Sequence, residues 1–432
     1  MKRILCIVFA CLLLAACAKT PANEPAAPVS EVTDPTAAPV VSDPVPAIDP
    51  VSLPTFTVPE INGYADFSDV LAAKLIDGTQ NRNLSPISVY LALAMVAEGA
   101  NGNTQAELLK LLGCRDVTEL RGVCGAMLNK LTANDEDATL TFANSLWMGD
   151  RDGALNFREP FLSALADTYR SEANAVKFGT VETSKQISDW IAEHTNGKIT
   201  PSPDAMQFDP STIAVLINTI YLKAAWRDPF YAAATKPGTF RAPDGDMTVD
   251  YMQQGFDNSY IVKGDGYLRY TLVTTVGSVT FVLPDEGVSL ESLLGSPEKI
   301  HALFHDGKGI NADVHVKLPK FKFFDKMELN KVLASLGLTL AFSETQADFS
   351  AMCDVPAYIS RVLQESYIGV DEDGIEAAAY TMVAVAEGAA MEIEELPKID
   401  FHLERPFLFE IKAFDGSVLF IGTVTAPTPA GE

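Results

Sequence analysis

Hydrophobic and polar positions follow helical periodicity in some segments and strand-like periodicity in others. After Ser85-Pro86, apolar residues lie nearly all round the predicted helix, which indicates a buried helix with an N-cap followed by a proline. The β-branched run Ile213–Leu222 predicts a buried strand, and Thr271–Leu283 predicts a hairpin that turns at Gly277-Ser278. Because these elements do not alternate in βαβ units, the pattern favours an α+β fold.

The stretch Tyr367–Phe409 combines two patterns that do not belong together. It begins like a strand, passes through the acidic turn Asp371–Gly374 and continues as a long run of small and apolar residues. Acidic residues and Pro397 then close the run. This composition is typical of a buried strand, whereas the boundaries are typical of an exposed loop.

The run after Gly374 separates into two faces if it is extended. Alternate residues of a strand point to opposite faces. One set is free of charge: Ile375, Ala377, Ala379, Thr381, Val383 and Val385. The other set contains the only charge between Ile375 and Ala386, at Glu376, together with Ala378, Tyr380, Met382, Ala384 and Ala386. The first face could therefore be buried without stranding an ion, which would cost several kcal/mol.

Composition and charge restrict the setting. The chain has 432 residues, of which 47% are hydrophobic and 21% charged, as in ordinary globular proteins. Its formal net charge of -25 argues against nucleic acid or heparin as a partner, because like charges repel.

The N-terminal segment has the features of an export signal. Lys2 and Arg3 precede a short apolar run, and Leu14-Ala15-Ala16-Cys17 resembles a bacterial lipobox. The resemblance implies a signal peptide over residues 1–16, a lipid anchor on Cys17 and attachment to the membrane of the bacterial cell envelope. Attachment at the periplasmic face and attachment at the cell surface are both consistent with this pattern. The alternative to lipidation is ordinary signal cleavage beside an incidental cysteine.

The chain then divides into a linker and one large domain. Residues 17–58 are rich in Pro and Ala without a period, which predicts a semi-rigid linker. No second linker or repeat follows, so one domain is predicted over residues 59–427, with a tail at 428–432.

Enzyme motifs and metal-binding patterns do not account for this sequence. It lacks the G-x-S-x-G, H-E-x-x-H, phosphate-loop and dinucleotide-binding patterns. The five histidines are scattered, and His301 and His305 have no evident third ligand, so surface histidines, no metal and no cofactor are expected. Cys114 and Cys124 could form a disulfide, but core packing of these two and of Cys353 is the favoured interpretation.

Several motifs together resemble one family. They include NSLWM (144–148), ISDWIAEHTNGKIT (187–200), LINTIYLKAAWRDPF (216–230), LPKFKF (318–323), LNKVLASLGLTLAFSETQADFSAM (329–352), EDGIEAAAYT (372–381) and RPFLF (405–409). In this order they resemble the serpin family over essentially all of residues 59–427. The resemblance implies a non-enzymatic α+β domain with three β-sheets, eight to nine helices and an exposed reactive-centre loop.

The resemblance also implies a mechanism and a set of residues. A serpin loop is cleaved by its target protease and inserts as a new strand into the main sheet, which traps the acyl-enzyme. The hinge would consist of Glu372, Gly374, Ile375, Glu376, Ala377, Ala378, Ala379 and Thr381. Family members usually carry Thr or Ser where this chain has Ile375, so a non-inhibitory serpin that acts as a surface binding or carrier protein is the alternative.

Further positions follow from the same resemblance. Ser85, Ser88, Asn218 and Gln364 would lie where the main sheet opens, and Trp226 at its top. Counting from the hinge gives Gly388–Ala389 as the reactive bond, with Ala386, Glu387, Met391, Glu392 and Glu395 as alternatives.

The expected partners follow from the loop's residues. The small or flexible candidates Ala386, Gly388, Ala389 and Met391 would suit elastase-like or subtilisin-like serine proteases, or papain-like cysteine proteases. No Arg or Lys lies between Asp371 and Pro397, which argues against trypsin-like targets. A monomer is expected.

Overall fold

The computed structural model describes residues 60–134, 138–150, 155–375 and 396–431. The chain divides into two compact units, Met1–Pro44 and Val45–Glu432, and all described residues belong to the second unit. The signal peptide, Cys17, the linker, most of the hinge and all candidate reactive bonds lie outside the described residues.

Nine α-helices occur in the described part of the chain. They are α1 (Tyr64–Leu75), α2 (Pro86–Gly99), α3 (Gly102–Leu111), α4 (Val117–Lys130), α5 (Glu159–Tyr169), α6 (Val181–His194), α7 (Leu290–Leu293), α8 (Pro297–His305) and α9 (Asn330–Ser335). Three 3-10 turns are η2 (Pro203–Met206), η3 (Ala232–Ala234) and η4 (Leu340–Phe342). Helix α2 begins at Pro86 and is buried on nearly every side, as its sequence predicts.

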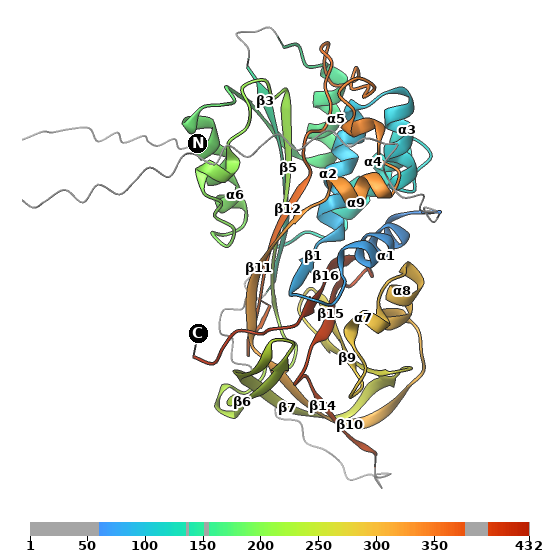
Figure 1. Cartoon of the computed structure of the whole chain (residues 1–432), viewed down its shortest axis with the longest axis vertical. Coiled ribbons are helices and arrows are strands. Elements are labelled where there is room, and N and C mark those ends of the chain that lie inside the picture. Colours follow the sequence, from blue (N-terminus) through green and yellow to red (C-terminus); the bar gives the residue numbers. More distant parts are fainter. Residues whose placement is uncertain (1–59, 135–137, 151–154, 376–395, 432) are drawn as a thin grey trace, which may run out of the picture. The chain divides into compact units, whose positions relative to one another are not determined.

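A seven-stranded sheet carries the strand that leads into the reactive-loop segment. Its order is β11-β12-β13-β5-β3-β2, and β4 pairs with β3. The strands are β2 (Ala133–Asn134), β3 (Ala138–Gly149), β4 (Ser171–Val176), β5 (Ala214–Ala225), β11 (Phe321–Glu328), β12 (Leu363–Val370) and β13 (Gly374–Ile375). Helix α2 packs on one face of β5 and α6 on the other (Figure 1).

A nine-stranded sheet contains the remaining described strands. Its order is β1-β16-β15-β9-β8-β7-β10-β14, and β6 pairs with β7. The strands are β1 (Arg82–Leu84), β6 (Lys236–Ala242), β7 (Gly245–Lys263), β8 (Tyr267–Val273), β9 (Gly277–Pro284), β10 (Gly309–Pro319), β14 (Lys398–His402), β15 (Phe407–Ala413) and β16 (Val418–Val424).

The described residues thus form two hydrogen-bonded sheets where three were expected. The reason is the 19-residue strand β7, which pairs with β6 near its start, with β10 along most of its length and with β8 at its end. This one strand joins ladders that would otherwise be separate sheets.

The predicted hairpin is present as β8 and β9, but its turn lies earlier than predicted. Thr274 Oγ1 accepts hydrogen bonds from the N–H groups of Val276 and Gly277, so Thr274–Val276 form the turn. Gly277 instead begins β9, where a Cβ atom would lie 1.8 Å from the carbonyl oxygen of Lys412 on β15. This glycine is required by close approach of two strands.

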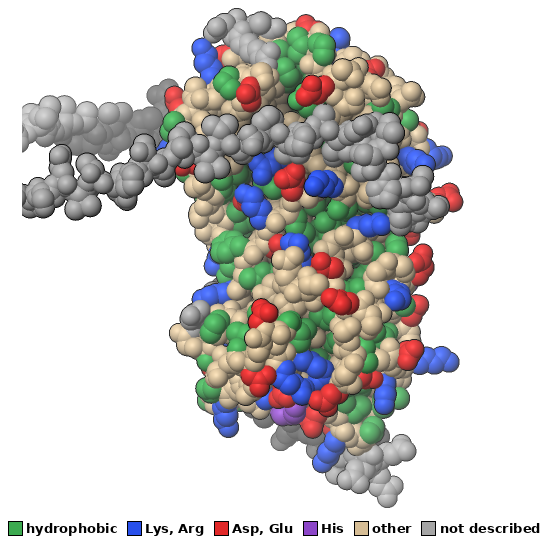
Figure 2. All heavy atoms as spheres, in the orientation of Figure 1, with side chains coloured by type: hydrophobic (Ala, Val, Ile, Leu, Met, Phe, Trp, Pro, Cys, Tyr) green, Lys and Arg blue, Asp and Glu red, His purple; other side chains and the backbone are tan. Residues whose placement is uncertain are grey.

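The C-terminal residues continue the fold and are not a free tail as far as Gly431. Ala430 N–H donates to the Thr248 carbonyl at 2.9 Å, and Gly431 N–H donates to Asp250 Oδ2 at 3.1 Å. On the face shown in Figure 2, acidic and basic side chains are interspersed. The net negative charge therefore does not gather into one acidic surface there.

Candidate functional site

The acidic turn after β12 is closed by its own hydrogen bonds. Asp371 Oδ1 accepts from the N–H groups of Asp373 at 3.0 Å and Gly374 at 3.3 Å. Gly374 has a φ of 154°, and a Cβ atom there would lie 2.2 Å from the carbonyl oxygen of Ala224 on β5. Only glycine allows the chain to approach β5 this closely.

The segment after β5 holds the turn in place. Trp226 is 3% exposed, and its Nε1–H donates to the Asp371 carbonyl at 2.9 Å. The backbone N–H groups of Trp226 and Phe230 donate to the carbonyls of Asp373 and Glu372, each at 2.9 Å. All three carbonyls of the turn are therefore satisfied by the five residues 226–230.

Two side chains fix the Glu372 carboxylate. Thr235 Oγ1 donates to it at 2.7 Å, and Lys320 Nζ lies 2.8 Å from it. Partial burial by itself would raise the pKa of Glu372, but these hydrogen bonds outweigh it and hold the pKa below its usual value. Burial raises the pKa of the neighbouring Asp371, so the pKa values of the two carboxyls are shifted in opposite directions.

Strand β13 lies between β12 and β5. Ile375 pairs with Val370 on β12 and with Ala224 on β5, and its side chain is 3% exposed. Within the described ranges, β13 is the only strand that pairs with both. The two residues form the start of a central strand that points into the sheet.

A pocket continues from β13 between β5 and β12. Its lining includes Ile220 and Leu222 from β5, and Tyr367 and Ile368 from β12. Ile375 also contributes, as do Ile411 and Phe420 of the other sheet. The pocket therefore has apolar side chains from both flanking strands along the path on which β13 would lengthen.

A polar cluster lies beneath β12. Gln364 is 7% exposed; its Oε1 accepts from Ser85 N–H at 3.1 Å and its Nε2 donates to the Ser85 carbonyl at 2.8 Å. Ser85 Oγ donates to the Leu419 carbonyl at 2.8 Å, so it does not cap α2 as its sequence position predicts. This cluster ties β12 to the start of α2.

Comparisons with known proteins agree with this architecture. The sequence model of a family described as "Serpin (serine protease inhibitor)" matches residues 62–427. The chain belongs to the serpin family. An uncharacterized serpin-like protein of Thermococcus kodakarensis is 32% identical over 382 residues, which cover 85% of this chain and 86% of the relative.

Two further proteins support the same assignment. The leukocyte elastase inhibitor of Homo sapiens is 31% identical over 358 residues, which cover 80% of this chain and 92% of the inhibitor. The crystal structure of the thermophilic serpin tengpin in its native state matches with a TM-score of 0.73 and 29% identity, covering 86% of this chain and 96% of tengpin. The predicted α+β serpin fold is confirmed, and because serpins are protease inhibitors, so is the prediction that the chain is not an enzyme.

The structure places the five predicted sheet-opening residues of this serpin in separate groups. Ser85 and Gln364 contact each other, and Trp226 contacts the hinge turn. Asn218 Nδ2 donates instead to Asn144 Oδ1 on β3 at 2.7 Å. Ser88 Oγ and Asn218 Oδ1 are buried and have no hydrogen-bond partner among the described residues.

Of the hinge residues, the structure describes Glu372, Gly374 and Ile375. Glu376, Ala377, Ala378, Ala379 and Thr381 lie outside the described ranges, as do Ala386, Glu387, Gly388, Ala389, Met391, Glu392 and Glu395. The partners Lys320, Thr235 and Phe230 were missed from sequence. Lys320 lies inside the quoted motif LPKFKF, but spacing alone does not connect it with Glu372.

The three cysteines of the described region are free. Cys124 and Cys353 are buried, and the half-buried Cys114 Sγ lies 3.5 Å from the Tyr90 hydroxyl. Burial raises the pKa of the Cys124 thiol, which keeps it neutral. Core packing therefore holds for Cys114 and Cys124, and they form no disulfide.

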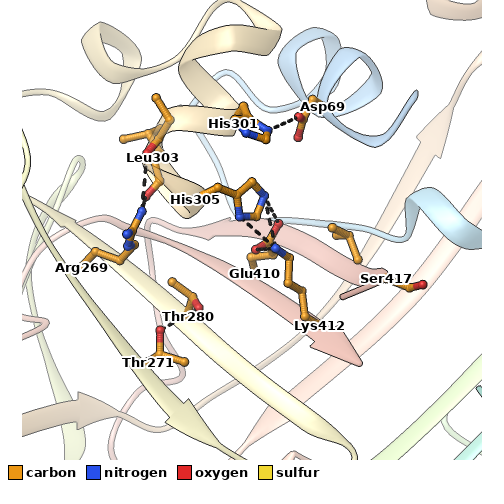
Figure 3. Close-up of polar contacts among 12 residues, drawn as sticks. Asp69, Arg269, Thr271, Thr280, His301, Leu303, His305, Glu410, Lys412 and Ser417 are labelled. Carbon is orange, nitrogen blue, oxygen red and sulfur yellow. Dashed lines mark hydrogen bonds and ion pairs between the residues drawn. The ribbon is translucent and has the colours of Figure 1, made fainter. Parts of the chain in front are cut away.

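The histidine prediction needs a correction. His301 has an acidic neighbour that the sequence did not reveal, because Asp69 of α1 lies 3.0 Å from its Nδ1 (Figure 3). His305 is half-buried rather than exposed, and burial lowers its pKa to about 4. Helix α8 brings the two histidines against α1 and β15, which are distant in sequence.

No helix in the described part of the chain is both long enough and apolar enough to cross a membrane.

Proposed function

We propose that this serpin is a suicide-substrate inhibitor of serine proteases with elastase-like or subtilisin-like specificity. The protease cleaves the loop within 386–395, and the chain from Ile375 onward then inserts between β5 and β12. The observation that carries the proposal is the position of Ile375, which pairs with both strands and is buried. An inserted strand would extend from a point where the ladder has already begun.

The departure at Ile375 does not argue against insertion. A branched side chain here is already accommodated in the sheet at 3% exposure, next to a pocket whose lining includes Ile220, Leu222 and Ile368. The uncharged residues Ala377, Ala379, Val383 and Val385 would follow it on the same face. Both points favour the inhibitor over the non-inhibitory carrier.

The choice of target rests on the loop sequence and on one relative. The favoured bond Gly388–Ala389 has a small residue on each side, and the human relative is named as an inhibitor of leukocyte elastase. Papain-like cysteine proteases are a further class that cleaves beside such residues.

Incubation with proteases tests the inhibitory function. The protein is mixed with pancreatic elastase, subtilisin, papain and trypsin, and SDS gels are run beside thermal unfolding of the cleaved product. A gel-stable complex with elastase or subtilisin, and a higher melting temperature after cleavage, are expected. Cleavage without a complex and with an unchanged melting temperature would overturn the mechanism and favour the carrier. Mass spectrometry of the released peptide identifies the bond.

The proposal extends to the location of the inhibitor. Export followed by lipidation of Cys17 would tether the domain through the 17–58 linker to the bacterial cell envelope. The supporting features are the apolar run after Lys2-Arg3 and the lipobox-like residues 14–17. Mass spectrometry of the membrane fraction should find diacylglyceryl-modified Cys17, and Cys17→Ala should release the protein. An unmodified N-terminus beyond Cys17 would contradict the anchor.

A further inference from the structure

The described part of the chain contains two groups of histidine and aspartate side chains that could each hold a metal ion. Within each group, the possible ligand atoms lie within 4.8 Å of one another. One is Asp69, His301 and His305; the other is His315, Asp400 and His402, which we call the strand-edge triad. Both bring together imidazole nitrogens and a carboxylate, the donors that Zn²⁺ and similar cations prefer.

The first group already contains a cation from the protein itself. Lys412 Nζ lies 2.9 Å from His305 Nδ1 and 3.5 Å from the buried Glu410 carboxylate (Figure 3). The ammonium group would repel a metal ion at this position. This group is therefore an internal charge cluster and serves as a control for the second.

The strand-edge triad forms because two parallel strands bring its residues into register. His315 on β10 is paired with Asp400 on β14, and His402 lies two residues further along β14, on the same face as Asp400. On its other side, His315 is paired with Gly255 of β7. A Cβ atom on Gly255 would have nothing within 4 Å, so the space beside the His315 position is open.

The ligand atoms of the triad have the separations of a tetrahedral metal site. His315 Nδ1 and His402 Nε2 share a hydrogen bond of 2.9 Å, which metal binding would replace, and Asp400 Oδ1 lies 3.7 Å from the first nitrogen and 3.6 Å from the second. Ligands bound at about 2.0–2.1 Å round a tetrahedral Zn²⁺ lie about 3.3–3.4 Å apart. The three measured distances bracket these values.

We propose that the strand-edge triad binds a Zn²⁺-like divalent cation. Three protein ligands leave the fourth position of a tetrahedral Zn²⁺ open. Water can occupy it because the triad is solvent-accessible: the side chains are 46% exposed for His315, 75% for Asp400 and 30% for His402. Figure 2 shows histidine at the surface near the end of the molecule that carries β7 and β14. The cation links β14, the edge strand that follows the loop segment, to β10.

Spectroscopic titration of the full-length protein with Co²⁺ tests the site. Co²⁺ reports tetrahedral nitrogen and oxygen ligands by visible absorption, and thiolate ligands by a separate charge-transfer band. We expect one equivalent with visible absorption that Zn²⁺ displaces. His315→Ala, Asp400→Asn and His402→Gln should each abolish it, whereas His301→Gln should leave it unchanged.

Thermal unfolding provides the second measurement. Zn²⁺ at about 100-fold above its Kd should raise the melting temperature by about 3–5 °C in the wild type, reversibly with EDTA, and not in His402→Gln. The metal-free variants should unfold at the wild-type temperature, because the substituted side chains are accessible. Absorption that survives in the three triad variants, disappears in His301→Gln or arises from thiolates alone would overturn the proposal.

Discussion

The two strands that flank residues 376–395 lie in opposite surroundings. The N-terminal flank, Gly374–Ile375, lies inside the seven-stranded sheet, is hydrogen-bonded on both sides and is buried. The C-terminal flank, Lys398–His402, lies at the edge of the nine-stranded sheet, pairs with β10 alone among the described strands and carries charged and exposed side chains. One flank is built to continue as a central strand, and the other to be held at an edge by polar side chains.

The largest difference should appear when a charge is placed on one face of the N-terminal flank. Ala379→Arg adds a charge to the face that would be buried on insertion, which costs several kcal/mol. The variant should form gel-stable complex with elastase at least about 100-fold less efficiently and be cleaved as a substrate. The efficiency is measured as the elastase activity that remains after incubation at increasing molar ratios of the variant to elastase.

Ala378→Arg is the matched control for that experiment. It adds the same charge to the face that already carries Glu376. This variant should keep its inhibition. Equal loss in both variants would mean that the chain after Ile375 does not enter the sheet with the alternation assumed here.

A second test concerns the strand that leads into the N-terminal flank. Gln364→Ala leaves the buried N–H of Ser85 without a partner, while the Ser85 carbonyl keeps only the bond from Val89 N–H, so the free energy of unfolding should fall by about 1–3 kcal/mol. Urea unfolding measures it. Gln346→Ala, an exposed glutamine, is the control and should change stability by less than about 0.5 kcal/mol. Similar losses in both variants would mean that the hydrogen bonds between Gln364 and Ser85 do not stabilise β12.

A third and smaller effect is expected at the turn. Glu372→Gln removes the ion pair with Lys320, whose side chain is 38% exposed, so solvent screening limits the loss to about 1 kcal/mol at pH 7. The folded-state pKa of Glu372 lies below its unfolded value. Its contribution is therefore complete above the unfolded value and declines as pH falls through the folded value.

Urea unfolding at pH 7 and at successively lower pH checks the sign. The gap between wild type and Glu372→Gln should narrow on acidification. Since burial raises the pKa of Asp371, protonation of that residue acts in the opposite direction in both proteins and cancels in the comparison. A gap that widens toward acid pH would contradict the assignment.

The smallest effect should be found at the C-terminal flank without metal. Asp400 is 75% exposed, so Asp400→Asn should change the free energy of unfolding by less than about 0.5 kcal/mol in EDTA. With Zn²⁺ present, the same variant should lack the wild-type rise in melting temperature. A large effect in EDTA would show that the carboxylate supports β14 by itself.

Periodicity and turn chemistry predicted the buried helix α2, the strand β5 and the β8–β9 hairpin, because each depends on neighbouring residues. The merger of two ladders through β7 was not predictable, since strand pairing over long separations leaves no local pattern. For the same reason, the contacts of Lys320 with Glu372 and of Asp69 with His301 could not be predicted from the sequence. Ser85 shows a different limit: its local pattern predicts an N-cap, but the Leu419 carbonyl takes its hydroxyl.

The pairing of Ile375 with both β12 and β5 has a kinetic consequence for the proposed mechanism. Extending an existing ladder by one residue requires no search for a partner, whereas starting a new strand requires closing a loop at an entropic cost. Since Ile375 is already paired on both sides, the proposed insertion after cleavage would begin as elongation of an existing strand. In that mechanism the number of residues between Ile375 and the cut bond would determine the length of the new strand, and the separation of β5 from β12 would determine the rate of insertion.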